Sequence, residues 1–337
     1  MYYSNNDVRV EEMQVPSIGD REILVKVLHC GICGSDVMEW YRIKKAPLVL
    51  GHEIAGIVEK VGIQVTKFKP GDRVFVSHHV PCNECHYCLR DAHTDCHTLH
   101  TTNFDPGGFS EFIRVPELQV DRGTFIIPDE LPLEMGVFIE PLACVVRGQR
   151  KAGLTPGETV LILGSGISGL LHIPLAKASK AGLVIATDIS QKRLDSAKIF
   201  GADYTFHASE DIPEKIRQLN NGHLADLVII CTAAISAHEQ ALECVESSGT
   251  ILLFGVASPG DIWQFPVFDF WKKGLKMVAT YAGAPVDIAQ SIEFMRSGKV
   301  KLQGMITHRL PLMEIQKGFD LVASAENSIK VIIDPHS

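Results

Sequence analysis

TVLILGSGISGL, residues 159–170, is an apolar run that leads directly into three glycines, Gly164, Gly166 and Gly169. In a strand–turn–helix of this kind, the first glycine permits the tight turn and the second lets the backbone approach a pyrophosphate. The third lets the helix pack close to the strand. The glycine spacing alone is a weak signal, and a glycine-rich turn without a ligand is the alternative. A strand before it and an apolar helix after it, whose N-terminus faces the phosphates, favour a dinucleotide site.

The next strand-like run, LVIATD, ends at Asp188, which follows Gly169 by 188 − 169 = 19 residues. A ribose-binding acid is expected about 20 residues after the glycines. Asp188 can accept hydrogen bonds from the adenosine ribose hydroxyls and would repel a 2′-phosphate, so the sequence favours NAD over NADP. Arg193 is near enough to weaken that preference or to stack on the adenine. A solvated or capping acid at position 188 is the alternative.

Strand-like runs recur between residues 158 and 282 and are mostly separated by helix-like stretches such as SQKRLDSAKIFG and SAHEQALECVESSG. The six runs are TVLILG, LVIATD, ADYTF, DLVIIC, TILLFG and KMVATY. Six strands joined by crossover helices predict an α/β fold with a doubly wound parallel sheet. The first 145 residues contain short β-like runs punctuated by Gly and Pro, which predict a β-barrel or a folded sheet with bulges.

Length and composition predict a globular protein of two domains. The chain has 337 residues, of which 46% are hydrophobic and 21% are charged. A net charge of −8 argues against nucleic-acid and anionic-membrane partners, which require basic surfaces. The polar N-terminus lacks the apolar core of a signal peptide, and no apolar run is long enough to span a bilayer. We therefore expect a cytoplasmic protein that acts on a small molecule.

Four of the nine cysteines cluster in CNECHYCLRDAHTDC, as Cys82, Cys85, Cys88 and Cys96. In a reducing compartment, clustered cysteines indicate metal binding rather than disulfides. Four thiolates at this spacing can close a tetrahedron around Zn²⁺ without an open position, which is typical of a structural site. Buried free thiols or disulfides are the alternative. Four neighbouring histidines are competing ligand candidates, but four cysteines suffice, so we interpret them as surface residues: His86, His93, His97 and His100.

A histidine and a glutamate stand side by side in GHEIAGIVEKVG, residues 51–62, at the edge of an apolar strand. Two polar groups in such a place need a partner, and a metal ion is one. Cys33 precedes His52 by 52 − 33 = 19 residues, and FIEPLACVV supplies Glu140. A thiolate, an imidazole and carboxylates suit a catalytic zinc that keeps one position open. Spacing alone does not prove this site, because isolated GHE sequences are mostly unrelated to metal and a lone cysteine is usually a core residue.

The glycine, histidine and glutamate pattern G-H-E-x2-G-x5-G-x2-V that starts at Gly51 resembles the signature of zinc-containing alcohol dehydrogenases. From ILVKVLHCGICGSD through the four-cysteine lobe to GSGISG, the chain is similar to the medium-chain dehydrogenase/reductase superfamily, with the motifs in family order. The resemblance implies a GroES-like β catalytic domain over residues 1–146, with a zinc lobe at about 78–100. It also implies a Rossmann NAD-binding domain over 147–283 and a return to the first domain over 284–337.

The same resemblance implies roles for individual residues. Cys33, His52 and Glu53 would face the catalytic zinc, and Glu140 would be a ligand or would hold the zinc water. Whether Glu53 or Glu140 binds the metal directly stays open. Ser35 would pass the hydroxyl proton outward, and it also suits a helix cap. The expected cofactor contacts are Gly164, Gly166, Ile167, Gly169, Asp188, Arg193, Cys231 and Val256.

Some features depart from the family pattern. Met38 stands where many members have a histidine that relays protons, and Arg147 stands where members often have histidine. The loop before His52, part of the substrate wall in the family, is short. The family pattern gives no ligand role to Cys30 and Cys144, which we interpret as core thiols.

The implied reaction is NAD-linked oxidation of a secondary alcohol to a ketone, with zinc as a Lewis acid on the alcohol oxygen. A glutamate at position 140 resembles the sorbitol, polyol and threonine dehydrogenase branches. A polyol or sugar alcohol is therefore the expected substrate, and L-threonine or another amino alcohol is the main rival. A catalytically silent NAD-binding structural or regulatory protein is the hypothesis from another class. The expected cofactors are NAD and two zinc ions per chain, and the resemblance implies a homodimer or homotetramer.

Overall fold

Two large sheets organise the chain, and each belongs to its own unit. The computed structural model describes all residues, 1–337. Unit 1 contains residues 1–143, 283–296 and 302–337, and unit 2 contains residues 144–282 and 297–301. No helix in the structure combines the length and the apolarity that crossing a membrane requires.

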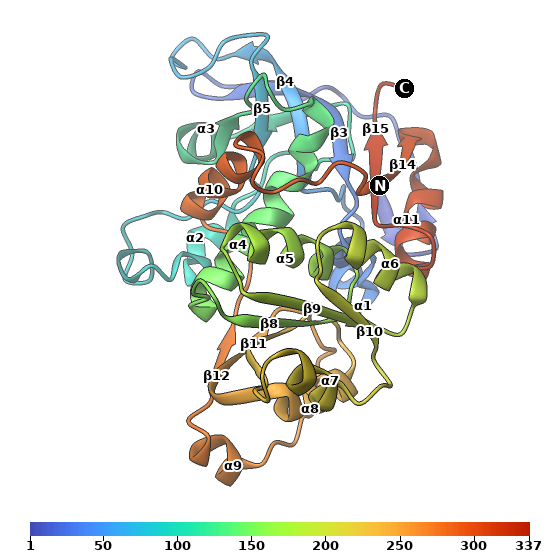
Figure 1. Ribbon diagram of the computed structural model, residues 1–337. Coiled ribbons are helices and arrows are strands. Elements are labelled where there is room, and N and C mark those ends of the chain that lie inside the picture. Colours follow the sequence, from blue (N-terminus) through green and yellow to red (C-terminus); the bar gives the residue numbers. More distant parts are fainter. The chain divides into compact units, whose positions relative to one another are not determined.

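Unit 2 contains a six-stranded parallel sheet, which confirms the doubly wound sheet that the sequence predicts (Figure 1). Its strands are β8 (Thr159–Leu163), β9 (Leu183–Asp188), β10 (Tyr204–His207), β11 (Ala225–Ile230), β12 (Val245–Leu253) and β13 (Lys276–Ala279). The spatial order is β10-β9-β8-β11-β12-β13. The strand order reverses between β8 and β11, and sheets of this kind bind ligands beyond the carboxyl ends of the strands at that point. The glycine-rich turn follows β8 and lies at this place.

Helices cover both faces of the parallel sheet. They are α5 (Ile167–Ala178), α6 (Gln191–Ile199), α7 (Ile212–Leu219) and α8 (Ile235–Cys244). A further helix, α9 (Val267–Lys272), precedes β13 and has no buried residue. Figure 1 has α5 and α6 on one face and α7 and α8 on the other. Because both faces are covered, all five residues of β8 are buried, and its sequence reads as a continuous apolar run. Helix α8 ends earlier than the run SAHEQALECVESSG suggests, because Val245 already pairs with Ala225 of the neighbouring strand.

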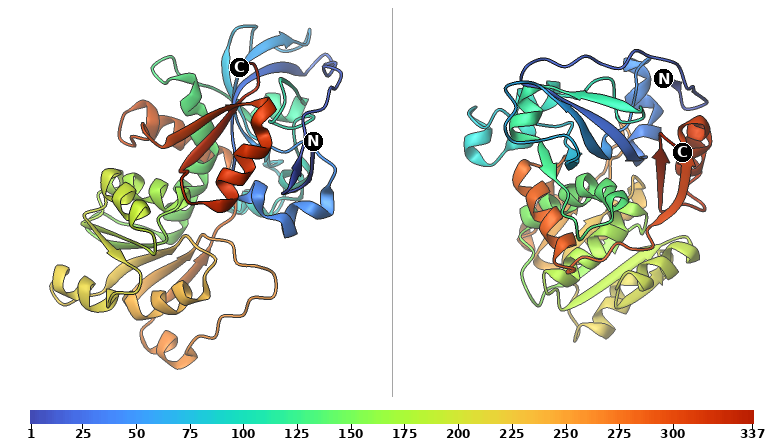
Figure 2. Two further views of the ribbon diagram at one scale, coloured as in Figure 1. Left: turned by 90° about the vertical axis from the view of Figure 1, so that its right-hand side faces the viewer. Right: turned by 90° about the horizontal axis from the view of Figure 1, so that it is seen from above.

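Unit 1 contains a seven-stranded, mainly antiparallel sheet, as the texture of the first 145 residues predicts. Its strands are β3 (Ile23–Gly31), β4 (Glu53–Val61), β5 (Arg73–Val76), β6 (Phe112–Val115), β7 (Thr124–Ile126), β14 (Ile306–Pro311) and β15 (Lys330–Asp334). The spatial order is β14-β15-β3-β4-β5-β7, and β6 also pairs with β3. Strand β15, red in Figures 1 and 2, therefore lies beside the blue β3, although the two are far apart in the chain.

The remaining strands and α-helices of unit 1 lie outside this sheet. They are β1 (Tyr2–Ser4), β2 (Asp7–Val8), α1 (Glu39–Arg42), α2 (His97–Thr101), α3 (Glu117–Arg122), α10 (Pro285–Arg296) and α11 (Ile315–Ser324). Helix α4 (Ile139–Ala152) begins in unit 1 and ends in unit 2. The core of unit 1 packs around β3 and β4, with Val25, Ile54 and Phe319 fully or almost fully buried. Antiparallel pairing places Gly31, the last residue of β3, opposite Glu53, the first residue of β4.

Candidate metal centres and dinucleotide site

Three of the predicted zinc ligands converge where β3 ends and β4 begins. Cys33 follows β3 and caps a 3₁₀ turn over Gly34–Val37, whereas His52 immediately precedes β4. Strand pairing brings these ends together, and the donor atoms of Cys33, His52 and Glu53 all lie within 4.8 Å of one another. Small side-chain rotations convert such a spacing into zinc bonds of about 2.0–2.3 Å. The three residues therefore fit one metal ion.

Glu53 has a buried carboxylate, and one of its two oxygens has no hydrogen-bond partner. Its Oε2 accepts a hydrogen bond from Lys330 Nζ at 2.6 Å, whereas its Oε1 is buried and has no hydrogen-bond partner. An unpaired buried carboxylate oxygen is costly unless a cation or a donor satisfies it. The carboxylate also fills the space in front of Gly31, where an added Cβ would lie 2.1 Å from Oε2. The unpartnered Oε1 of Glu53 therefore indicates a cation at the cluster of Cys33, His52 and Glu53.

Asp36 supports His52. Its Oδ1 lies 3.5 Å from His52 Nδ1, and its Oδ2 accepts a hydrogen bond from the backbone N–H of Cys33 at 3.0 Å. A carboxylate beside one ring nitrogen fixes the ring orientation and leaves Nε2 for a metal. Burial by itself would lower the pKa of His52, but the charge and hydrogen bond of Asp36, together with Cys33, raise that pKa well above its ordinary value. Asp36 was not among the predicted site residues, although it ends the quoted run ILVKVLHCGICGSD.

Arg42 of α1 joins Ser35 and Asp36. Its Nε donates to the Ser35 carbonyl oxygen at 2.9 Å, and its Nη2 donates to Ser35 Oγ at 2.9 Å and to Asp36 Oδ1 at 3.3 Å. The backbone N–H of Ser35 donates to Cys33 Sγ at 3.4 Å, as expected of the second residue after a capping side chain. Because Arg42 occupies only a lone pair of Ser35 Oγ, the hydroxyl hydrogen of Ser35 stays available for donation to another group.

Lys330 is the second residue that sequence analysis missed. It is buried, and besides Glu53 it donates to the carbonyl oxygen of Ile32 at 3.3 Å. Burial by itself would lower the pKa of Lys330, but the negative charges of Glu53, Cys33 and Glu140 outweigh burial and raise it. The signal was present in the sequence, because Lys330 is a lone cation in the apolar run SIKVIIDP, which forms the buried strand β15.

Glu140 lies in the first turn of α4 and is not among the three residues whose donor atoms cluster. Its charge nevertheless acts on Lys330, so it lies near the cluster. Its role as a ligand stays a prediction. Cys30 is buried with its thiol 3.8 Å from the carbonyl oxygen of Gly31, and Cys144 is half-buried. Neither belongs to a group of potential metal ligands.

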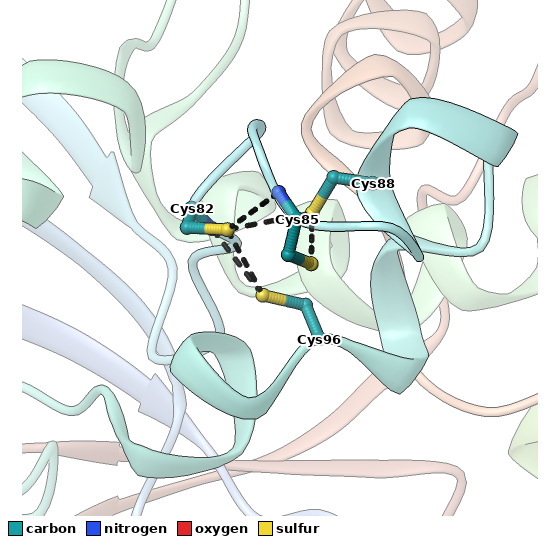
Figure 3. Close-up of side chains that lie close together, drawn as sticks. All are labelled: Cys82, Cys85, Cys88 and Cys96. Carbon is teal, nitrogen blue, oxygen red and sulfur yellow. Dashed lines mark hydrogen bonds between the residues drawn. The ribbon is translucent and has the colours of Figure 1, made fainter.

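The four cysteines of the predicted structural site lie together in the loop after β5 (Figure 3). Sulfur–sulfur distances are 3.5 Å for Cys85–Cys88, 3.6 Å for Cys82–Cys96 and 3.9 Å for Cys82–Cys88. Four sulfurs bound to one zinc at about 2.3 Å lie about 3.8 Å apart, so the group fits a closed tetrahedral site. Burial would raise the pKa of Cys96, but backbone donors from Cys82 and Leu99 hold it at about 6, which favours a thiolate. Three of the neighbouring histidines are exposed and His93 is partly buried.

The glycine-rich turn has the geometry of a phosphate cradle. Gly164 has φ +94°, a left-handed conformation that favours glycine, and Gly166 has open space where a side chain would be. A Cβ on Gly169 would lie 2.0 Å from the carbonyl oxygen of Gly164, so α5 packs against the turn only because this residue is glycine. The turn and the N-terminus of α5 therefore fit a pyrophosphate.

Asp188 ends β9 and is nearly buried, with an exposed fraction of 5%. Its two oxygens accept hydrogen bonds from the backbone N–H groups of Ser165 and Ser190 at 2.8 and 2.9 Å. Arg193 Nη1 lies 3.6 Å from Asp188 Oδ2. The turn of the glycine motif thus binds the carboxylate of Asp188, the predicted ribose acid, and the Arg193 guanidinium lies beside it.

The other predicted cofactor residues follow strands of the same sheet. Ile167 is the first residue of α5, and Gly166 is its N-cap. Cys231 follows β11, and its backbone N–H donates to the Leu163 carbonyl oxygen at 2.8 Å. Val256 lies in the loop after β12 and is 52% exposed. All three are therefore at the carboxyl ends of the strands, where ligands of doubly wound sheets bind.

Comparison with known proteins agrees with this geometry. Residues 19–129 match the alcohol dehydrogenase GroES-like domain, and residues 168–297 match the zinc-binding dehydrogenase family. A probable D-xylulose reductase A of Aspergillus fumigatus is 32% identical over 97% of this chain and 94% of its own length. Sorbitol dehydrogenase of Bacillus subtilis is 30% identical over 99% of this chain and 96% of its own length.

A solved structure has the same fold over nearly the whole chain. The crystal structure of a zinc-binding dehydrogenase from Sinorhizobium meliloti 1021, bound to NADP, superimposes with a TM-score of 0.88 at 28% identity and covers 99% of this chain and 97% of that one. The predicted combination of a GroES-like domain with a Rossmann-type parallel sheet is confirmed. The chain therefore belongs to the zinc-dependent alcohol dehydrogenases of the medium-chain dehydrogenase/reductase superfamily and is similar to their polyol dehydrogenase branch.

Proposed function

We propose that the chain oxidises a secondary alcohol, most suitably a polyol or sugar alcohol, to a ketone. NAD would supply the acceptor for the hydride of the carbinol carbon, and the hydroxyl proton would leave to solvent. The observation that carries this proposal is the cluster of Cys33, His52 and Glu53 with a buried, unpartnered Glu53 oxygen. The names of the relatives, sorbitol dehydrogenase and xylulose reductase, support a polyol as the substrate class. Zinc, when bound there, supplies a Lewis acid that favours the alkoxide form of the substrate.

Each residue at the cluster has its own role in this proposal. Cys33 and His52 hold the metal, and Asp36 keeps the imidazole of His52 in the right orientation. Glu53 has Oε1 buried without a hydrogen-bond partner, while Lys330 donates to Oε2. Glu140 either completes the ligand set or binds the water that the substrate displaces.

Ser35 handles the hydroxyl proton in this proposal. Its Oγ accepts a hydrogen bond from Arg42, a side chain that can only donate, so Arg42 cannot take the proton onward. Met38 has no acidic proton either, and the Glu39 carboxylate accepts a hydrogen bond from the backbone of Asn5. Water that reaches the half-buried Ser35 is the onward acceptor in this proposal, and the second oxygen of the exposed Glu39 carboxylate is the alternative.

The glycine turn and its surroundings bind the cofactor. Gly164, Gly166 and Gly169 receive the pyrophosphate, and Asp188 accepts hydrogen bonds from the adenosine ribose, which favours NAD. Arg193 lies close enough to neutralise part of the Asp188 charge, so we expect a moderate rather than an absolute preference over NADP. Further contacts would come from Ile167, Cys231 and Val256. The four-cysteine lobe holds the second zinc, which stabilises its loop.

A homo-oligomer is the proposed assembly, with a second copy of the chain as the partner. Helix α9 exposes Val267, Phe268 and Trp271 by 69%, 65% and 75%, and a contiguous apolar surface of this kind marks an interface. The next strand, β13, is an edge of the parallel sheet, so its backbone groups are open to pairing. Light scattering on the native chain and on Trp271→Glu tests this, because a monomeric native chain contradicts it. We also place the chain in the cytoplasm, where reducing conditions keep its clustered thiols available for zinc.

The function is tested by absorbance at 340 nm with NAD and a panel of neutral polyols, L-threonine and simple secondary alcohols, combined with metal analysis. We expect two zinc ions per chain and turnover of at least one secondary alcohol. Cys33→Ser should abolish turnover and remove one zinc while leaving NAD affinity unchanged. Cys30→Ser is the matched control, because Cys30 is in the same C-x-x-C segment but outside the ligand cluster. Zinc and NAD binding without turnover of any alcohol would overturn the proposal in favour of a silent binding protein.

A further inference from the structure

A series of contacting side chains runs from the metal cluster into the short loop before His52. From His52 the contacts pass to Asp36 at 3.5 Å and from Asp36 to Arg42 at 3.3 Å. Arg42 lies over the Tyr41 ring, with Cζ 4.8 Å from the centroid, and Lys45 Nζ lies 5.7 Å from the same centroid. The loop thus places two cations on one aromatic ring next to the metal ligands.

Two histidines after β5 extend this series of contacts on the other side of His52. The His78 ring lies 4.8 Å from the His52 ring and 3.7 Å from the His79 ring, measured between centroids. Burial, and then the nearby charges of His52, His100, Arg42 and Lys45, lower the pKa of His79 to about 3. The Nδ1 atom of His78 is buried and has no hydrogen-bond partner, so this imidazole has a nitrogen available for a substrate hydroxyl group.

The positive charges of Arg42 and Lys45 are only partly compensated by the acids of the loop. The buried Asp36 accepts from Arg42 Nη2, but Arg42 Nη1 has no hydrogen-bond partner. Lys45 is exposed and makes no ion pair, and its Nζ lies 5.7 Å from the centroid of the Tyr41 ring. The acid of the loop, Glu39, accepts from the backbone of Asn5. A guanidinium nitrogen and an ammonium group thus remain available beside the metal cluster.

We propose that the natural substrate is an alcohol that carries an anionic group, a phosphate ester or a carboxylate, which binds Arg42 Nη1 and Lys45 while its hydroxyl group lies at the Cys33–His52 cluster. The inference rests on the proposed function and narrows its substrate class. The chemistry shared by phosphate and carboxylate is a compact anion with several acceptor oxygens, which a guanidinium and an ammonium group bind well. His78 and His79 would bind the hydroxyl groups between the two ends.

The test compares kcat and KM for three matched substrates: a neutral polyol, its monophosphate ester and the corresponding aldonate. We expect kcat/KM to be about tenfold or more higher for at least one anionic substrate, the gain of one or two well-placed charge pairs. Comparison of the monophosphate ester with the aldonate shows whether the site prefers a phosphate or a carboxylate group. Inorganic phosphate should also inhibit turnover of the neutral polyol competitively.

Lys45→Gln isolates the anion contact, because Lys45 makes no hydrogen bond in the structure and is exposed. It should raise KM for the anionic substrate about three- to tenfold, with little change in kcat, and leave KM for the neutral polyol unchanged. Lys44→Gln is the control, since this neighbouring exposed lysine does not lie over the Tyr41 ring. Equal or better use of the neutral polyol, or equal effects of both variants, would overturn the anion inference and leave the dehydrogenase function intact. Failure of every alcohol would instead contradict the function.

Discussion

Lys330 Nζ lies 2.6 Å from Glu53 Oε2, and both side chains are buried although 277 residues separate them in the chain. The pair exists because β15 joins the sheet beside β3, and β3 pairs with β4, which Glu53 begins. The charges at the metal cluster are therefore balanced by a cation from the far end of the chain.

Replacing this cation should be costly. Lys330→Met leaves the Glu53 carboxylate buried without its partner, and the loss of one member of a buried ion pair typically costs about 3–5 kcal/mol. Urea unfolding of the metal-free protein measures the change. Lys67→Met is the control, because Lys67 pairs with Asp121 at an exposed site, where a pair contributes about 0–1 kcal/mol. Equal losses in the two variants would mean that Lys330 does not balance Glu53.

Asp188 should control the choice of cofactor. Asp188→Asn keeps a side-chain oxygen that can accept from Ser165 or Ser190 but removes the negative charge that repels a 2′-phosphate. We expect NAD to bind about five- to thirtyfold more weakly, the equivalent of about 1–2 kcal/mol, and NADP to bind better. Isothermal titration with both cofactors measures the ratio. Asp195→Asn on the exposed side of α6 should leave the ratio unchanged, and an unchanged ratio in Asp188→Asn would exclude this residue as the ribose acid.

The four-cysteine lobe should lose its metal when one sulfur is removed. Cys85→Ser opens the tetrahedron, so zinc content should fall from two ions to one per chain, with earlier thermal unfolding. Metal analysis and thermal denaturation measure both effects. His86→Gln tests the competing interpretation that a neighbouring histidine is a ligand. Its ring is exposed and contacts Arg90, so this variant should keep both zinc ions, and loss of one would show that histidine takes part.

His172 should make unit 2 sensitive to acid. It is buried against Phe254, receives a hydrogen bond from Gln149 at its Nδ1, and burial lowers its pKa from 6.5 to about 3. Between those two values the unfolded chain binds a proton that the folded chain does not. Stability therefore falls as pH drops below 6.5, by up to about 1.4 kcal/mol per pH unit from this group.

The variant His172→Leu removes this contribution. The slope of unfolding free energy against pH, measured by urea unfolding from pH 7 to pH 5, should become less steep by about one proton. His223→Leu is the control, because the His223 side chain is 74% exposed and its slope should match the native chain. A native slope in His172→Leu would mean that this imidazole is protonated in the folded state.

The amino-acid sequence by itself determined the elements whose signal is local. The glycine turn, the apolar strands of unit 2 and the four-cysteine lobe depend on residues within a few positions of one another, so spacing and periodicity reveal them. The cluster of Cys33, His52 and Glu53 was also predicted, but through a family pattern rather than through spacing alone. Asp36 was missed although it lies three residues after Cys33, because an acid in a turn is usually a solvated cap.

Only the tertiary structure decided which distant charges meet. The pairing of Lys330 with Glu53 requires β15 to lie beside β3, and nothing in either segment specifies that neighbour. The contacts of Arg42 with Ser35 and Asp36, and the approach of His78 to His52, likewise depend on how a short loop and the end of β5 fold onto the cluster. Such contacts follow from strand order and side-chain rotamers, which many residues set jointly, whereas a sequence motif records only residues that are neighbours along the chain.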